Sequence, residues 1–116
     1  MPYSMINKEF LKGILKPLIL KVLQDNTKMY GYEITQEVEK LTSGKIKLSY
    51  GGLYPILHTL EAEGIVLTET VNVDNRIRKY YYLTKEGTLN ANERIRELEE
   101  FISTIQCVLK PKPSLQ

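Results

Sequence analysis

In residues 49–84 the spacing of the apolar side chains changes from the period of a helix to the period of a strand. Ser49 can cap the helix and Gly64 can end it. Pro55 requires a helix start close before it, because a proline deep in a helix loses a backbone hydrogen bond. The apolar residues fall at i, i+3, i+4 and i+7 and are Leu53, Ile56, Leu57 and Leu60. This pattern predicts a helix from residue 50 that is followed by β structure.

Two alternating segments after this helix predict a hairpin, which we call the wing (residues 66–83). Both segments are rich in β-branched or aromatic residues, and Asp74 and Asn75 between them favour a turn. A helix followed by such a hairpin is typical of the second half of a winged helix-turn-helix.

The first helix of the motif is predicted upstream, in residues 30–41. Ser43 and Gly44 end this helix, and residues 45–48 lead to the second one. The side chains that share its apolar face, opposite an acidic side, are Tyr30, Ile34, Val38 and Leu41. Two helices joined by a glycine-containing connection match the helix-turn-helix arrangement.

The apolar stretch of residues 10–23 is interrupted by three lysines, at positions 12, 16 and 21. Because a membrane span needs about 18 uninterrupted apolar residues, this stretch predicts a core helix instead. Gly13 and Pro17 predict a break between a short leading helix and the helix that follows.

Four blocks of this sequence resemble the PadR-type transcriptional regulators. They are YGYEI at 30–34, SYGGLYPIL at 49–57, LEAEGI at 60–65 and RKYYYLTKEG at 78–87. The blocks follow the order of the family within residues 11–87, and four in register are more specific than any one. The family commonly has a small hydroxyl residue where this chain has Gly52. The resemblance implies DNA binding, and dimerisation through the C-terminal helix and the leading N-terminal one.

The helix from residue 50 is expected to enter the major groove of double-stranded DNA, while the wing cations hold neighbouring phosphates. Its start carries no acidic side chain, and backbone amides at a glycine-rich helix start suit a phosphate oxygen. An ordinary solvated hairpin also carries charges, so a surface role stays open for the wing cations. The predicted DNA-binding residues are Lys45, Lys47, Ser49, Tyr50, Gly51, Gly52, Tyr54, Pro55, His58, Thr59, Arg76, Arg78 and Lys79.

The C-terminal segment has an apolar stripe with spacings of 3 and 4 residues, which is the heptad pattern that paired helices bury. Thr84 can cap this helix, and Pro111 ends it before a polar tail. Packing of the stripe on the chain's own core is the alternative to a subunit interface. The predicted dimer-interface residues are Ile95, Leu98, Phe101, Ile102, Ile105 and Leu109, and Val108 widens the stripe.

Catalysis is not expected. His58 is the only histidine, and no second general base, nucleophile motif or phosphate loop accompanies it. Cys107 is the only cysteine, which excludes an internal disulfide and a cysteine-based metal site.

Tyr81 must face away from Tyr80 and Tyr82, so these rings cannot form one stacking surface and at least one is expected in the core. The net charge is only +2, so local cations must supply the electrostatics.

The sequence therefore predicts a mostly α fold with a two-stranded β-wing. A winged helix-turn-helix domain (1–84) precedes a dimerisation helix (85–110) and a tail (111–116). We expect a cytoplasmic, homodimeric repressor that binds a palindromic operator, without a cofactor or a membrane partner, and that a small-molecule effector of unknown identity can release. The alternative is a winged-helix module that uses the same surface to bind a protein.

Overall fold

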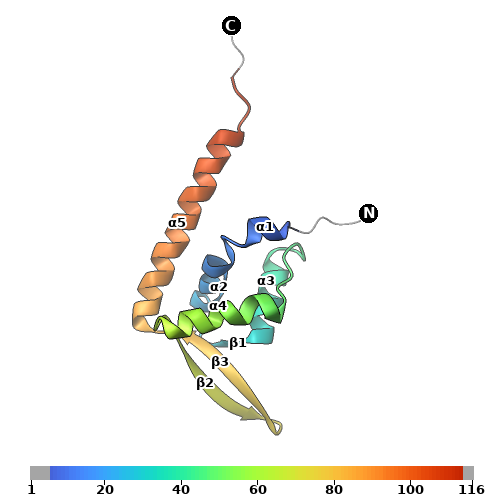
Figure 1. Cartoon of the computed structure of the whole chain (residues 1–116), viewed down its shortest axis with the longest axis vertical. Coiled ribbons are helices and arrows are strands. Elements are labelled where there is room, and N and C mark those ends of the chain that lie inside the picture. Colours follow the sequence, from blue (N-terminus) through green and yellow to red (C-terminus); the bar gives the residue numbers. More distant parts are fainter. Residues whose placement is uncertain (1–5, 114–116) are drawn as a thin grey trace.

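The computed structural model describes residues 6–113, which form five helices and three strands (Figure 1). In chain order these are α1 (Lys8–Leu11), α2 (Leu15–Gln24), β1 (Met29–Tyr30), α3 (Gly31–Leu41), α4 (Tyr50–Ala62), β2 (Val66–Val73), β3 (Arg76–Leu83) and α5 (Lys85–Leu109). The expected domain 1–84 and tail 111–116 lie outside the described residues at positions 1–5 and 114–116. None of the helices in residues 6–113 is both long and apolar enough to cross a membrane.

The helix predicted from residue 50 is α4, and its two ends are those that the sequence indicates. The Ser49 hydroxyl accepts a hydrogen bond from the Gly52 amide at 3.1 Å, and Gly64 ends the helix with a φ of +76°. Pro55 lies inside α4 rather than in its first turn, so it donates no hydrogen bond to the Gly51 carbonyl. The residues of α4 with no exposed surface are Leu53, Leu57 and Leu60.

The wing is an antiparallel hairpin whose register runs from Val66 opposite Leu83 to Val73 opposite Arg76. Asp74 and Asn75 both have positive φ, 50° and 63°, as the two central residues of a type I′ turn do. The hairpin projects from the helices at the end of the molecule opposite the free end of α5 (Figure 1). The prediction of a two-stranded wing was incomplete, because β1 pairs with the other edge of β3 and gives the order β1-β3-β2. Two residues are too few to show a strand period.

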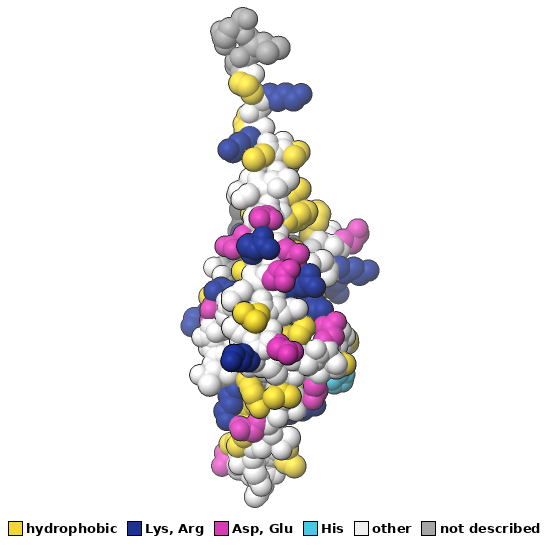
Figure 2. All heavy atoms as spheres, turned by 90° about the vertical axis from the view of Figure 1, so that its left-hand side faces the viewer, with side chains coloured by type: hydrophobic (Ala, Val, Ile, Leu, Met, Phe, Trp, Pro, Cys, Tyr) yellow, Lys and Arg dark blue, Asp and Glu magenta, His cyan; other side chains and the backbone are white. Residues whose placement is uncertain are grey.

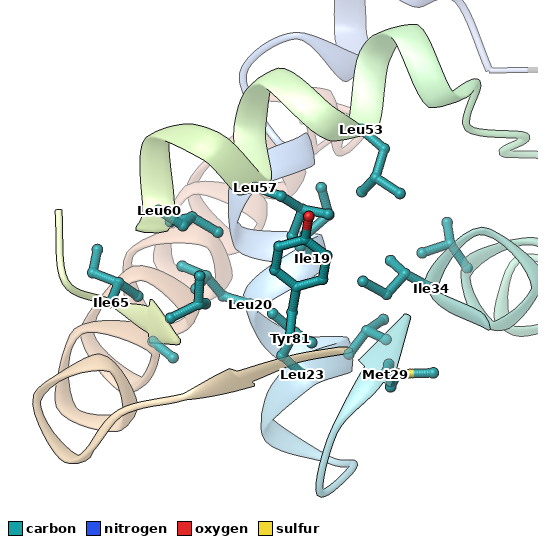
Figure 3. Close-up of a cluster of buried hydrophobic side chains, with 14 of the residues drawn as sticks. Ile19, Leu20, Leu23, Met29, Ile34, Leu53, Leu57, Leu60, Ile65 and Tyr81 are labelled. Atoms are coloured by element: carbon teal, nitrogen blue, oxygen red, sulfur yellow. The ribbon is translucent and has the colours of Figure 1, made fainter. Parts of the chain in front are cut away.

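Tyr81 occupies the centre of the hydrophobic core with 1% of its surface exposed, and its ring points from β3 towards α4 (Figure 3). The expectation that one of the three adjacent tyrosines is a core residue is therefore confirmed. Ile34 and Val38 on α3 are also buried, but the prediction was wrong for Leu41, which is 63% exposed. Leu41 is the last residue of α3 and lies beyond its packed turns.

Only the first half of α5 packs on the domain. Gly87 and Ala91 are buried and Ile95 and Leu98 are partly buried, whereas the apolar residues from Phe101 onward are exposed. Figure 2 shows these apolar side chains at the surface along the upper part of α5. Packing on the chain's own core thus accounts for the beginning of the predicted stripe and leaves its second half uncovered by the described residues.

The start of α5 is locked onto the turn that follows α4. The Thr84 hydroxyl donates a hydrogen bond to the Gly64 carbonyl at 2.8 Å and accepts one from the Gly87 amide at 2.8 Å. Gly87 lies so close to this turn that a Cβ there would be 1.9 Å from the Ile65 carbonyl oxygen. The direction of α5 is therefore fixed relative to the C-terminal end of α4.

Candidate nucleic-acid interface

The exposed side of α4 carries three rings at successive helical turns, which we call the aromatic ladder: Tyr50, Tyr54 and His58. Neighbouring ring centroids are 5.7 Å and 6.4 Å apart. Tyr50 is 49% exposed, and His58 and Thr59 are also at the surface. The Thr59 hydroxyl donates a hydrogen bond to the Pro55 carbonyl at 3.0 Å, so it is already engaged within the helix.

The first turn of α4 contains two glycines and therefore presents its backbone at the surface. A Cβ at Gly51 or Gly52 would meet only the Ser49 hydroxyl oxygen, at 3.9 Å or 3.5 Å, so packing within the fold does not require glycine there. The first turn has no acidic residue, and the amides of a helix start form the positive end of its dipole. This geometry lets a negatively charged backbone approach the helix closely.

Tyr54 has a structural contact that its helical spacing does not reveal. A Cβ at Gly31, the first residue of α3, would lie 2.4 Å from the Tyr54 hydroxyl oxygen. The ring is partly buried against the hydrophobic core. Tyr54 therefore fixes the spacing between α3 and α4 in addition to presenting one edge at the surface.

A concavity of about 390 Å³ separates α4 from the wing, and we call it the notch. Tyr54 and His58 line it from α4, Gly31 lines it from α3, and Ile77, Arg78 and Lys79 line it from β3. Ile77 is 77% exposed. The notch thus brings β3, with Arg78 and Lys79, close to Tyr54 and His58 of the aromatic ladder.

The wing cations lie on two different faces of the hairpin. Successive side chains alternate, so Lys79 shares the face of Tyr81, while Arg76 and Arg78 lie on the opposite face. The guanidinium of Arg78 is 4.6 Å from the centroid of the Tyr30 ring, and its hydrogen bond with Tyr80 raises the pKa of Arg78. Lys79 instead forms an ion pair with a carboxylate of α4, Glu61, at 3.6 Å.

The remaining predicted DNA-binding residues surround the start of α4. Lys45 and Lys47 are exposed on either side of buried Ile46, in the segment that leads into the helix. Ser49 and Pro55 are also exposed. The structure therefore brings one group together at the start and outer face of α4, and it distributes the wing cations around the hairpin.

Sequence reasoning missed two residues at this interface. Tyr30, expected on the apolar face of α3, lies in β1 and supports Arg78 with its ring. Glu61, which the sequence placed only within the motif block at 60–65, contacts the wing. Both contacts join residues far apart in the chain, and spacing within one helix gives no signal for them.

A larger apolar groove of about 630 Å³ lies between α1, α2 and α5. Phe10 and Ile14 line one side, and Leu98 and Phe101 of the predicted dimer interface line the other. The other predicted interface residues differ in exposure: Ile95 is partly buried on its own domain, and Ile102, Ile105 and Leu109 are 47%, 38% and 75% exposed. Residues 6–113 hold no group of three histidine, cysteine or acidic side chains suited to a metal ion.

Comparisons with known proteins agree with this architecture. Residues 19–93 match the family described as Transcriptional regulator PadR-like family. The transcriptional regulator Rv3488 of Mycobacterium tuberculosis is 38% identical over 93 residues, which cover 80% of this chain and 83% of that protein.

Solved structures show the same fold. A transcriptional regulator from Clostridium thermocellum has a TM-score of 0.79 at 24% identity, covering 89% of this chain and all of that one. A PadR family transcriptional regulator from Eggerthella lenta has a TM-score of 0.73 at 27% identity, covering 90% of this chain and 88% of that one.

Proposed function

The chain belongs to the PadR-like family of transcriptional regulators, and we propose that it is a repressor that binds a palindromic operator as a homodimer. The observation that carries the proposal is the outer face of α4, which combines a bare, acid-free start with exposed aromatic and hydroxyl side chains. Such a face can enter the major groove and meet base edges.

The proposed DNA-binding residues divide into those that contact base edges and those that contact the sugar-phosphate backbone. Tyr50, His58 and Thr59, with the exposed edge of Tyr54, lie where a helix in the groove meets base edges. The start of α4, the two lysines that precede it and the wing cations would hold the sugar-phosphate backbone. The proposed backbone contacts are Ser49, Gly51, Gly52, Pro55, Lys45, Lys47, Arg76, Arg78 and Lys79.

The exposed half of the α5 stripe supports the proposal of a homodimer. Phe101 and Leu109 are 58% and 75% exposed, and a second α5 would remove these side chains from water. A two-fold axis between the subunits would present two copies of α4 to half-sites about one helical turn, ~34 Å, or a multiple apart. Because Thr84 and Gly87 fix α5 to the end of α4, the dimer would set this spacing.

The same geometry supports the proposal that a small molecule releases the protein from DNA. A ligand that binds between subunits and changes the angle of α5 would change the separation of the two α4 helices. The groove beside Leu98 and Phe101 lies where such a ligand could act. We place the protein in the cytoplasm, where its operator would be accessible.

The test compares binding to the promoter fragment beside the protein's own gene with binding to scrambled DNA of equal length. Fluorescence anisotropy should show a preference for the promoter and a steep loss of affinity with salt. His58→Ala and Tyr50→Ala alter exposed positions, and at least one should lower the ratio of specific to non-specific affinity about tenfold. Both variants keeping full discrimination, while folded and dimeric, would favour the protein-interaction module instead.

Repression has its own measurement. Added dimer should reduce transcription from the promoter fragment in a purified transcription reaction, with a midpoint near the operator dissociation constant. An increase in transcript would mean that the protein activates.

A further inference from the structure

Glu61 joins the last turns of α4 to both strands of the wing. One carboxylate oxygen lies 3.6 Å from the Lys79 ammonium on β3, and the other accepts a hydrogen bond from the Thr68 hydroxyl on β2 at 3.4 Å. This acidic side chain therefore stands beside a proposed DNA-holding cation.

Lys79 differs from the other wing cations in its surroundings. Its ammonium lies 5.6 Å from the centroid of the Tyr81 ring and beside the Glu61 carboxylate. Arg78 on the opposite face lies over the Tyr30 ring. Of these two cations, Lys79 is the one whose charge is matched by a carboxylate of the helix that would enter the groove.

A lysine without a partner at the notch would attract any phosphate, whatever the DNA sequence. A carboxylate beside it must first be displaced, and the base contacts that seat α4 in the operator groove would offset this cost, whereas scrambled DNA offers no such contacts. The carboxylate therefore lowers affinity for scrambled DNA more than affinity for the operator. Discrimination is a ratio of two affinities, and weakening the wrong complex improves it as much as strengthening the right one.

We propose that Glu61 is a positioning residue that restrains Lys79 and fixes the wing against α4. Glu61 would thereby raise discrimination between operator and other DNA, and this inference rests on the proposed DNA-binding function. On scrambled DNA, Lys79 stays paired with Glu61 and contributes little. The Glu61 carboxylate on α4 would thus limit non-specific binding to DNA.

The chain provides a matched control two residues farther along. Glu63 also carries one negative charge and pairs with a lysine, since its carboxylate lies 3.1 Å from the Lys16 ammonium. The side chains of the Glu61 pair are 37% and 44% exposed, and those of the Glu63 pair are 47% and 35% exposed. Glu63 contacts α2 rather than the wing. Glu61→Gln and Glu63→Gln therefore make the same change in net charge, but only the first releases Lys79.

The experiment measures binding to scrambled duplex and to the promoter fragment at two salt concentrations for four proteins: wild type, Glu61→Gln, Glu63→Gln and Glu61→Gln/Lys79→Gln. Glutamine keeps the shape of Glu61 and an oxygen that can accept from Thr68. Glu61→Gln should tighten binding to scrambled DNA and steepen its salt dependence by about 0.9, the slope of one added phosphate contact. Between 50 and 200 mM salt, that slope corresponds to about a 3.5-fold larger gain at the lower concentration.

The controls assign this gain to Lys79. Glu63→Gln should leave the salt slope within about 0.3 of the wild type, because it adds no phosphate contact. Lys79→Gln in the Glu61→Gln background should return the slope to the wild-type value. Promoter affinity should rise less than scrambled affinity in Glu61→Gln, so discrimination falls about threefold at the lower salt concentration. Thermal unfolding midpoints should remain close, since an exposed ion pair adds little stability.

Equal slopes for Glu61→Gln and Glu63→Gln would overturn the proposal while leaving promoter recognition intact. A slope gain that persists in the double variant would also overturn it, because Lys79 would not be the released cation. If the wild type itself shows no preference for the promoter fragment, the proposed function fails, and this proposal fails with it.

Discussion

Gly31 and Gly51 both lie in the first turn of a helix, but the structure gives them different roles. A Cβ at Gly31 would collide with the Tyr54 hydroxyl, whereas one at Gly51 would meet only the Ser49 hydroxyl oxygen at 3.9 Å. The first glycine makes room for the Tyr54 side chain, and the proposed DNA complex uses the open space at the second. At the residue scale, stability and binding can therefore be separated by two matched substitutions.

Gly31→Ala should lower the free energy of unfolding by about 1–3 kcal/mol, because the added methyl group displaces the Tyr54 side chain from its position against α3. Gly51→Ala should raise that free energy by up to about 1 kcal/mol, since alanine favours the helix. The same Gly51→Ala should weaken operator binding about tenfold, roughly 1.4 kcal/mol, by holding the DNA backbone away from the helix start. Urea unfolding and anisotropy measure the two effects. Full operator affinity in Gly51→Ala would remove the close approach from the proposed complex.

Tyr81 predicts a loss of stability in alkali. Burial raises the pKa of the Tyr81 phenol above its ordinary value of 10.0. The folded protein therefore keeps this proton at a pH where the unfolded chain releases it, and the free energy of unfolding falls as the pH rises above about 10. Tyr81→Phe has no such proton, so its unfolding free energy should fall less between about pH 8 and pH 10.5. An identical fall in both proteins would show that other groups cause it.

At the scale of elements, the wing and α5 are two attachments to α4 with different rigidity. The base of the wing packs in the core through Val66 and Tyr81, whereas its outer part reaches away from the helices and contacts α4 through exposed polar side chains such as Glu61. The start of α5 is fixed by the Thr84 hydrogen bonds and by close packing of Gly87 on the Ile65 carbonyl. Movements of α5 should therefore reach α4 more directly than movements of the wing tip.

Gly87→Ala tests the α5 attachment. A Cβ 1.9 Å from a backbone oxygen forces α5 away from the turn, with an expected loss of about 3 kcal/mol of unfolding free energy. Gly13→Ala is the control, because nothing lies within 4 Å of a Cβ there. Thermal and urea unfolding of the two variants give the comparison. Equal stability would mean that α5 can shift without cost.

Arg76→Ala tests the wing. Arg76 is exposed beside the turn, and its loss should weaken binding to promoter and scrambled DNA by the same factor and lower the salt slope by about one. Lys21→Ala removes the same charge from α2 and should leave the slope nearly unchanged. Altered base preference at one operator position in Arg76→Ala would contradict the assignment of this residue to phosphate.

At the scale of the whole molecule, the described chain is elongated, 70 × 39 × 21 Å, because the second half of α5 extends beyond the packed domain. A long helix with an apolar stripe exposed to water gains stability when a second helix covers that stripe. The proposed dimer would thus complete a surface that the single chain leaves open.

Ile102→Glu with Ile105→Glu should convert the proposed dimer to a folded monomer, since burying each carboxylate costs several kcal/mol. Both residues lie outside the domain core, so thermal unfolding of the monomer should remain cooperative. Ser103→Glu with Cys107→Glu adds the same two charges on the opposite side of α5 and should leave the dimer intact. Sedimentation velocity separates the two states, and an intact dimer in the first variant would place the interface elsewhere.

The sequence alone determined the elements whose signals lie within a few residues of one another. Ser49 and Gly64 bound α4, Thr84 caps α5, and Asp74 with Asn75 turns the hairpin, because caps and turns form between near neighbours in the chain. The apolar spacing also identified the buried side of α4. These features, together with the four motif blocks, were enough to predict the fold class and the family.

Only the tertiary structure decided which residues from different elements meet. It added β1 to the sheet, placed Tyr54 on Gly31, left Leu41 in water and paired Lys79 with Glu61. Each of these outcomes depends on how helices and strands pack, which local spacing cannot encode because the partners are distant in the chain. The faces of the wing cations were implicit in the strand period. The contacts of Arg78 were set by the pairing of β1 with β3, and those of Lys79 by the packing of α4 against the sheet.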